Sequence, residues 1–115
     1  MNLQLLVLRT SDPERLAEFY NLLGLTFEYH KHGNSPYHYS GLLGEATLEI
    51  YPLSKNQIEV DKNLRLGFGI DNFEAVIERL KESHIKFSSE PTQTEFGFMA
   101  LIVDPDGRKV ELYKR

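Results

Sequence analysis

The first 24 residues show a short apolar run followed by helical spacing of apolar positions. The run Leu3–Leu8 predicts a buried strand. Pro13–Leu23 predicts a helix, because Ser11 with Glu14 matches a capping box and Gly24 suits a left-handed end. The apolar stripe of this helix comprises Leu16, Phe19, Tyr20 and Leu23. The chain therefore begins with a strand and then a helix.

Alternation of apolar and polar residues then replaces the helical pattern. It predicts three antiparallel strands near 25–32, 37–43 and 46–53, separated by turns at 33–36 and 44–45. A polar connector without periodicity follows, SKNQIEVDKN.

The second half repeats this plan. Leu64–Ile70 predicts a strand, Asp71 with Glu74 a second capping box, and the apolar stripe that follows a helix ending near Ser83. A turn is predicted at 90–92. The further strands are expected at Lys86–Phe87, Phe98–Val103 and Lys109–Lys114.

The two halves align residue by residue. Leu8 falls on Phe68 and Tyr20 on Leu80, a separation of about 60 residues that indicates one unit used twice. The stretch LEIY in the first half likewise matches VELY in the second, offset by two more residues. We expect an α+β fold of two tandem βαβββ modules, with module 1 at 1–53, a connector at 54–63 and module 2 at 64–115.

The composition disfavours or excludes several kinds of binding and catalysis. Thirteen Lys and Arg against 17 Asp and Glu leave a net charge of −4, which disfavours general nucleic-acid binding. The chain has no cysteine, so thiolate catalysis and Cys-ligated zinc are excluded. No apolar stretch is long enough to span a membrane, and the first residues lack the pattern of a signal peptide, so we expect a cytoplasmic protein. Motifs for nucleotide hydrolysis or serine catalysis are absent.

Four segments carry a family resemblance. They are, in order, SDPERLAEFYNLLGL, LEIYP, FGIDNFEAVIERLKESHI and DPDGRKVELY. Together they resemble the vicinal oxygen chelate superfamily, which includes glyoxalases, bleomycin-resistance proteins and extradiol dioxygenases. The resemblance implies two βαβββ modules with curled mixed sheets around a cavity, and a divalent metal in the catalytic members.

The resemblance also implies where such a metal would lie. The four ligand positions, commonly His, Glu, His and Glu, correspond here to Leu5, Glu49, Arg65 and Glu111. Leucine has no donor atom and arginine stays protonated, so the usual metal centre is not expected. We expect Arg65 to lie between the two carboxylates and to replace the charge of the metal.

Further candidates come from strand alternation and from the resemblance. Tyr51 shares a strand face with Glu49. Arg9 lies in a stretch similar to the L-R-V-x-D of glyoxalases, whose Arg contacts the carboxylate of glutathione, although Tyr51-Pro52 replaces the aromatic-Asn pair expected after the Glu. Phe96–Met99 is expected either to line a ligand site or to pack in the core. The residues predicted to contact a ligand are Arg9, His38, Glu49, Tyr51, Arg65 and Glu111, with Glu49 and Glu111 also candidates for catalysis.

Three histidines surround the first predicted hairpin. His30, His32 and His38 present a second route to metal, because imidazoles with Glu49 suit Zn, Ni or Fe. The alternative places His38 or Tyr39 at the mouth of a cavity, where it donates a hydrogen bond to a ligand.

These residues are compatible with three different functions. The first is a small-molecule-binding protein that lacks the usual metal site and needs no cofactor. The second is a metal-dependent lyase, isomerase or dioxygenase of the glyoxalase type. The third is a dimeric interaction module without a ligand. A homodimer is expected, because open sheets need their edges covered.

Overall fold

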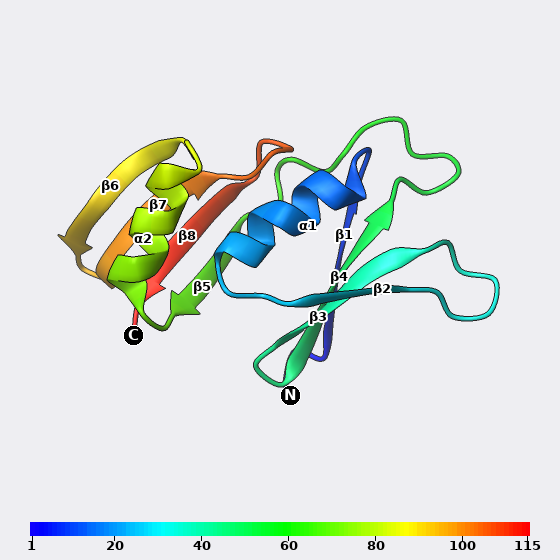
Figure 1. The fold of residues 1–115 in the computed structure, drawn as a ribbon, viewed down its shortest axis with the longest axis horizontal. Coiled ribbons are helices and arrows are strands. Elements are labelled where there is room, and N and C mark those ends of the chain that lie inside the picture. The colour runs from blue at the N-terminus through cyan, green and yellow to red at the C-terminus, as the bar shows by residue number, and fades with distance from the viewer. The chain divides into compact units, whose positions relative to one another are not determined.

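The computed structural model describes residues 1–115. The chain divides into two compact units, Met1–Val60 and Asp61–Arg115. Each unit consists of one helix and one four-stranded sheet (Figure 1).

The sheet of the first unit consists of β1 (Leu5–Thr10), β2 (Phe27–His30), β3 (His38–Leu43) and β4 (Ala46–Pro52). Their order is β1-β4-β3-β2, with β1 parallel to β4 and the other neighbours antiparallel. A parallel pair needs a crossover connection, and the helix between β1 and β2 begins that crossover. The sheet is mixed and open, with β1 and β2 at its edges.

The helix of this unit, α1 (Pro13–Leu22), contacts β1, β3 and β4. Asp12 caps it by accepting a hydrogen bond from the Arg15 backbone N–H, so the capping box predicted at Ser11 and Glu14 is wrong. Pro13 occupies the first helical position, where its fixed φ fits and its missing N–H costs nothing, which makes the preceding residue the cap. The buried face of α1 comprises Leu16, Ala17, Phe19 and Tyr20.

The second unit has the same order of elements. It contains β5 (Leu66–Ile70), α2 (Phe73–Glu82), β6 (Phe87–Thr94), β7 (Gly97–Val103) and β8 (Lys109–Lys114). The sheet order is β5-β8-β7-β6, with β5 parallel to β8. This arrangement matches that of the first unit strand for strand. The predicted fold class, α+β with tandem βαβββ modules, is confirmed.

The start of α2 differs from the prediction. Asn72 is the N-cap and has a left-handed backbone with φ of 54°, and its side chain makes no capping hydrogen bond. Glu74 pairs instead with Lys114 on β8, so the capping box predicted at Asp71 and Glu74 is wrong. Asparagine tolerates the left-handed region, which lets the chain turn sharply from β5 into the helix. At the other end His84 has φ of 60° and its N–H bonds to the Lys81 carbonyl oxygen, as a helix terminus requires.

The strand β6 is longer than predicted. The turn predicted at 90–92 is wrong, because β6 continues through Pro91 to Thr94. The pairing register with β7 shifts twice, between Phe87 and Ser89 and between Ser89 and Thr92. An edge strand with such irregularities accommodates a proline, since no neighbour needs the missing N–H.

Burial alternates along the strands as the sequence pattern predicts. On β5, Leu66, Phe68 and Ile70 are buried while the two intervening glycines are exposed. On β4, Leu48 and Ile50 are fully buried. Each sheet therefore packs one face on its core and leaves the other for polar chemistry. Neither helix has the length and apolar character needed to cross a bilayer.

Candidate functional site

The polar face of the second sheet holds the first group of functional side chains. Glu111 and Tyr113 alternate on β8 with Val110 and Leu112, which are fully buried. Gly67 on the neighbouring strand pairs with Glu111 and adds no side chain to this face. The carboxylate and the phenol consequently lie side by side above the sheet.

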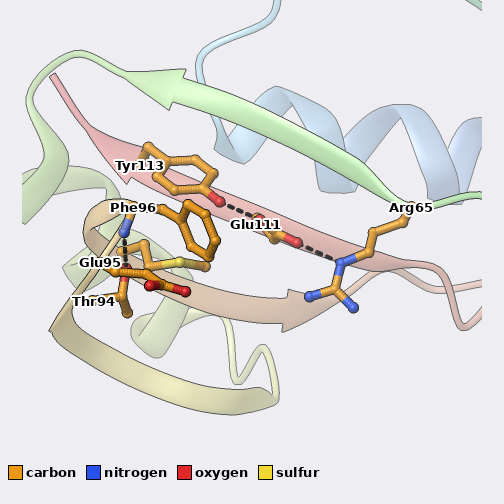
Figure 2. A pocket seen from close by; sticks show the side chains of 7 residues that line it. Arg65, Thr94, Glu95, Phe96, Glu111 and Tyr113 are labelled. Atoms are coloured by element: carbon orange, nitrogen blue, oxygen red, sulfur yellow. Dashed lines mark hydrogen bonds and ion pairs between the residues drawn. The ribbon is translucent and has the colours of Figure 1, made fainter.

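Arg65, just before β5, completes a row of three polar groups. Its Nε donates to Glu111 Oε2, and the Tyr113 hydroxyl donates to Glu111 Oε1 (Figure 2). The Tyr113 hydrogen bond and then the Arg65 contact lower the pKa of Glu111. The same hydrogen bond to Glu111 raises the pKa of Tyr113. Glu111 is therefore held as a carboxylate, while the Arg65 side chain stays 51% exposed.

These three residues line a pocket of about 480 Å³. The turn between β6 and β7 forms its opposite wall and presents Phe96, which is 74% exposed. Thr94 fixes this turn, because its Oγ1 accepts from the Phe96 N–H at 3.1 Å (Figure 2). The same Oγ1 donates to the Gly97 carbonyl oxygen at 2.7 Å. The complete lining is Arg65, Thr94, Glu95, Phe96, Met99, Glu111 and Tyr113.

In the first unit a row of rings and charges lies on the corresponding face. His38 stacks on Tyr51 with ring centroids 4.1 Å apart, and the Arg9 guanidinium lies 4.9 Å from the Tyr51 ring centroid. Arg9 also donates from Nη1 to the Pro52 carbonyl oxygen at 3.1 Å. Three residues that the sequence proposed for ligand contact are thus brought together.

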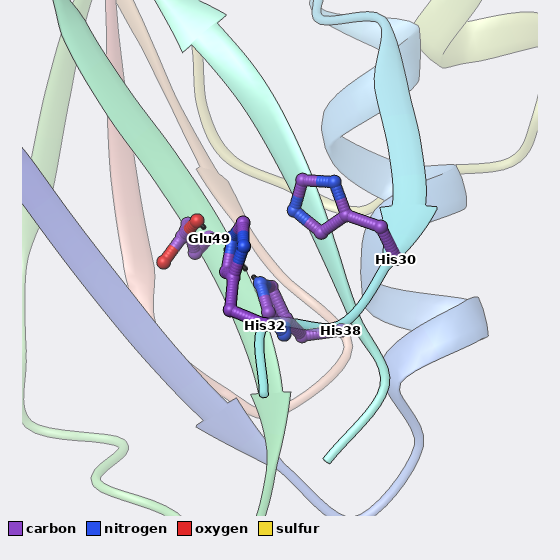
Figure 3. A group of neighbouring side chains, drawn as sticks. All are labelled: His30, His32, His38 and Glu49. Atoms are coloured by element: carbon purple, nitrogen blue, oxygen red, sulfur yellow. Dashed lines mark ion pairs between the residues drawn. The ribbon is translucent and has the colours of Figure 1, made fainter. Parts of the chain in front are cut away.

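A group of four potential metal ligands adjoins this row. We call it the His/Glu cluster; it consists of His30, His32, His38 and Glu49. One ligand atom from each residue lies within 4.8 Å of every other (Figure 3). The histidines come from the end of β2, the loop after it and the start of β3, while Glu49 lies in the middle of β4. A group that can hold a metal is therefore present in the first unit.

At the four positions that the resemblance assigns to the usual metal, two side chains cannot act as ligands. Leu5 offers no donor atom. Arg65 holds Glu111 in an ion pair, so a permanent cation already satisfies that carboxylate. Glu49 lies instead next to His38, whose Nε2 is 3.6 Å from its Oε2.

Several site predictions can be compared with these contacts. Arg65 contacts Glu111, which is one of the two carboxylates expected beside it. His38, predicted at the mouth of a cavity, is completely buried. Sequence reasoning missed Tyr113 as a site residue, although the repeat aligns it with Tyr51 and so contained the signal. Phe96 lines the pocket, in agreement with one of the two alternatives for that segment.

The sequence matches the profile of the Glyoxalase/Bleomycin resistance protein/Dioxygenase superfamily over residues 2–112. The chain belongs to this superfamily. No curated protein sequence is detectably similar to it.

Solved structures share the fold at low sequence identity. A superfamily member from Sphaerobacter thermophilus has a TM-score of 0.79 at 15% identity, over 100% of this chain and 98% of that chain. TnmS3, an antibiotic binding protein from a Streptomyces species, has a TM-score of 0.77 at 23% identity, over 99% and 95%. The oxidase ChaP-H2 has a TM-score of 0.78 at 16% identity, over 100% and 94%. At these identities the likeness establishes the fold, and function must come from the site.

Proposed function

We propose that this superfamily member binds a small organic molecule in the pocket of its second unit, without using the family's usual metal site. The observation that carries the proposal is the pocket itself. Its volume of about 480 Å³ lies in the range of small-molecule sites, and it combines apolar walls with a few convergent polar groups.

The lining defines the chemistry of the ligand. Phe96, Met99 and the Tyr113 ring form an apolar surface suited to an aromatic or otherwise flat molecule. Arg65 uses its Nε for Glu111 and keeps its two terminal amino groups as donors for a ligand oxygen. Glu95 adds a second carboxylate, which accepts hydrogen bonds from ligand N–H or O–H groups. A flat molecule that carries both an anionic oxygen and hydrogen-bond donors fits these groups.

A fluorescent aromatic anion, 8-anilinonaphthalene-1-sulfonate, tests the pocket directly. We expect saturable binding to the folded protein and a loss of affinity of about tenfold for Phe96→Ala, because one exposed ring supplies much of the apolar wall. Arg65→Gln should weaken binding of this anion as well. The matched control is Ile58→Ser, which removes an apolar side chain that is 94% exposed and does not line the pocket. Equal affinity for Phe96→Ala and Ile58→Ser would exclude this pocket as the site.

A second candidate function is a metal-dependent lyase, isomerase or dioxygenase. The His/Glu cluster favours it, because three imidazoles and a carboxylate form a suitable ligand set for a transition metal. Assays of the purified protein with added Zn²⁺, Ni²⁺ or Fe²⁺ on glutathione hemithioacetals and on catechols test this candidate. Turnover that disappears in Glu49→Gln would favour it over simple binding.

The proposal also includes a homodimer in the cytoplasm. Both sheets are open, and β1 and β5 each lie at a sheet edge. Uncovered edges are a ready template for pairing with another chain. Sedimentation at tens of micromolar protein tests the assembly, and a single monomeric species would refute it. Cell fractionation tests the compartment.

A further inference from the structure

The strand pairing explains why the His/Glu cluster assembles in the first unit. His30 and His38 are direct partners across the antiparallel pair β2 and β3. On the next strand, Ser40 pairs with Glu49, which brings that carboxylate to within 3.6 Å of His38. His32 lies two residues beyond His30, and their ring centroids are 4.5 Å apart. Neighbouring strands hold His30, His38 and Glu49 in register, and the loop after β2 adds His32 to them (Figure 3).

Two buried nitrogens in the cluster have no hydrogen-bond partner. His38 is completely buried, and its Nδ1 lies 3.0 Å from the Pro36 carbonyl oxygen. A carbonyl oxygen only accepts, so the Nδ1–H of His38 donates to it, and Nε2 is the ring nitrogen left to face the cluster. That Nε2 is buried, unpartnered and directed at Glu49, which is itself an acceptor. His30 Nε2 is likewise buried without a partner.

A metal ion bound between His38 Nε2 and Glu49 would give both groups a partner. Buried polar atoms normally have partners, and leaving one unsatisfied is destabilising. A histidine that ligates a metal through one nitrogen usually donates its other N–H to a backbone carbonyl, as His38 does to Pro36. Both observations fit a cation bound by nitrogen and oxygen lone pairs.

We propose that the His/Glu cluster binds a divalent first-row transition metal ion, with Zn²⁺ as the best match. Three imidazole nitrogens and one carboxylate oxygen form a set that zinc, nickel, copper and iron accept, whereas magnesium and calcium prefer oxygen ligands alone. The site shares only Glu49 with the family's usual ligand positions, and its three other ligands are different residues. It also does not use the pocket proposed for the organic ligand.

The distances permit this assignment with a small adjustment. Zinc bonds of 2.0–2.1 Å in a tetrahedron place ligand atoms about 3.4 Å apart. His38 and Glu49 are already at 3.6 Å, while the widest separation in the cluster is 4.8 Å. His32 is exposed and lies at the turn before Gly33, so rotation of its side chain can shorten the longest separations. The pair formed by His38 and Glu49 is preorganised, and the exposed His32 completes the site.

Four protein ligands leave a tetrahedral ion with no open position. A site in which all four side chains bind the ion is closed and therefore structural, whereas the catalytic candidate above requires that the exposed His32 leave its position to water or substrate. The ion would join β2, an edge strand, to β3 and β4. Tyr51 supports the site from one side, since its ring stacks on His38 at an interplanar angle of 9°. We therefore assign the ion a role in holding the first hairpin on the sheet.

Metal binding by the full chain tests this assignment. The protein is treated with EDTA, dialysed and titrated with Zn²⁺ by calorimetry and with Co²⁺ by visible absorption, with Mg²⁺ as the negative probe. We expect one ion per chain, a Co²⁺ spectrum of tetrahedral type, and a higher melting temperature with Zn²⁺ but not with Mg²⁺.

Variants locate the ion. His32→Ala changes an exposed side chain and should weaken Zn²⁺ binding at least about tenfold, as should Glu49→Gln. The matched control is His84→Asn, which removes the one histidine outside the cluster and keeps a residue that tolerates φ of 60°. Equal Zn²⁺ affinity in His32→Ala and the parent would overturn the assignment. So would ¹⁵N NMR of the metal-free protein that shows His38 as a charged imidazolium whose signals Zn²⁺ does not change, because a proton would then occupy the place of the ion.

Discussion

Arg108 is the buried cation on which the second unit depends. Its side chain is 1% exposed. Nη1 donates to Asp106 Oδ2 at 2.8 Å and to Asp104 Oδ2 at 3.2 Å, and Nε donates to the Asp61 carbonyl oxygen at 2.9 Å. Burial opposes the charge, but the hydrogen bonds and charges of Asp106 and Asp104 outweigh it and raise the pKa of Arg108. The guanidinium thus joins the start of the unit to the turn before β8.

The perturbation is Arg108→Met, which keeps much of the side-chain volume and removes the charge. Asp104 is 3% exposed as a residue, and its Oδ1 accepts the backbone N–H groups of Asp106 and residue 108. Without the guanidinium, the buried Asp104 carboxylate loses this ion pair. Removing one partner of a buried ion pair costs about 3–5 kcal/mol. Because Asp106 is only slightly exposed, its screening by water reduces this cost little.

Thermal and urea unfolding followed by circular dichroism measure this cost. At roughly 4 °C per kcal/mol for a chain of this size, the melting temperature of Arg108→Met should fall by about 12–20 °C. The double variant Asp104→Asn with Arg108→Met removes both charges and keeps the Oδ1 acceptor, so it should recover about half of the loss. A single variant that loses under about 1 kcal/mol would refute the buried-pair reasoning. A double variant no more stable than the single one would show that packing, and not the unpaired charge, is responsible.

Two further predictions concern the two sheets. Tyr113→Phe removes the hydrogen bond that contributes most to the lowered pKa of Glu111, so that pKa should rise toward its ordinary value of 4.5 in a ¹³C NMR titration. A lowered carboxyl pKa stabilises the fold above pH 4.5, and this stabilisation is lost as the pH falls through the folded-state pKa. Tyr113→Phe should therefore be less stable than the parent at neutral pH, and the difference between the two proteins should shrink on acidification. An unchanged Glu111 titration would contradict the assignment. Gly41→Ala places a Cβ 2.9 Å from the Thr26 carbonyl oxygen and 3.1 Å from Phe27 Cδ1, so urea unfolding should show a destabilised protein. The control is Gly67→Ala, which should be tolerated because its Cβ meets nothing closer than 3.7 Å. Equal stability of the two alanine variants would show that the backbone yields around Gly41.

Local sequence determined the elements and their orientation. The period of apolar residues placed both helices and the strands of both halves, because burial of one face of each element dominates folding. The repeat then specified the architecture, since two copies of one pattern build two copies of one unit. Predictions failed at Asp12, Asn72 and Pro91, where the competing choices differ by one hydrogen bond or by the position of a strand at a sheet edge.

The candidate functional sites depended on tertiary structure more than the helices and strands did. The family resemblance of the sequence pointed to Glu49 and Glu111, and the sequence named His30, His32 and His38 as one alternative for a metal. Periodicity tells which face of a strand a residue occupies but not how close a loop residue comes to that face. A distance of a few ångströms decides whether a side chain can ligate a metal. Only the pairing of β2, β3 and β4 shows the three histidines converging on one carboxylate.

The same reason explains why the sequence did not assign Tyr113 and Phe96 to a site. Tyr113 was visible only as the repeat partner of Tyr51, and its hydrogen bond to Glu111 depends on the rotamers of both side chains. Phe96 had two equal interpretations, and the turn held by Thr94 directs it away from the core. Composition and pattern thus determine what is buried along this chain, whereas the contacts among the residues left outside the core are set by side-chain geometry that only the folded sheets define.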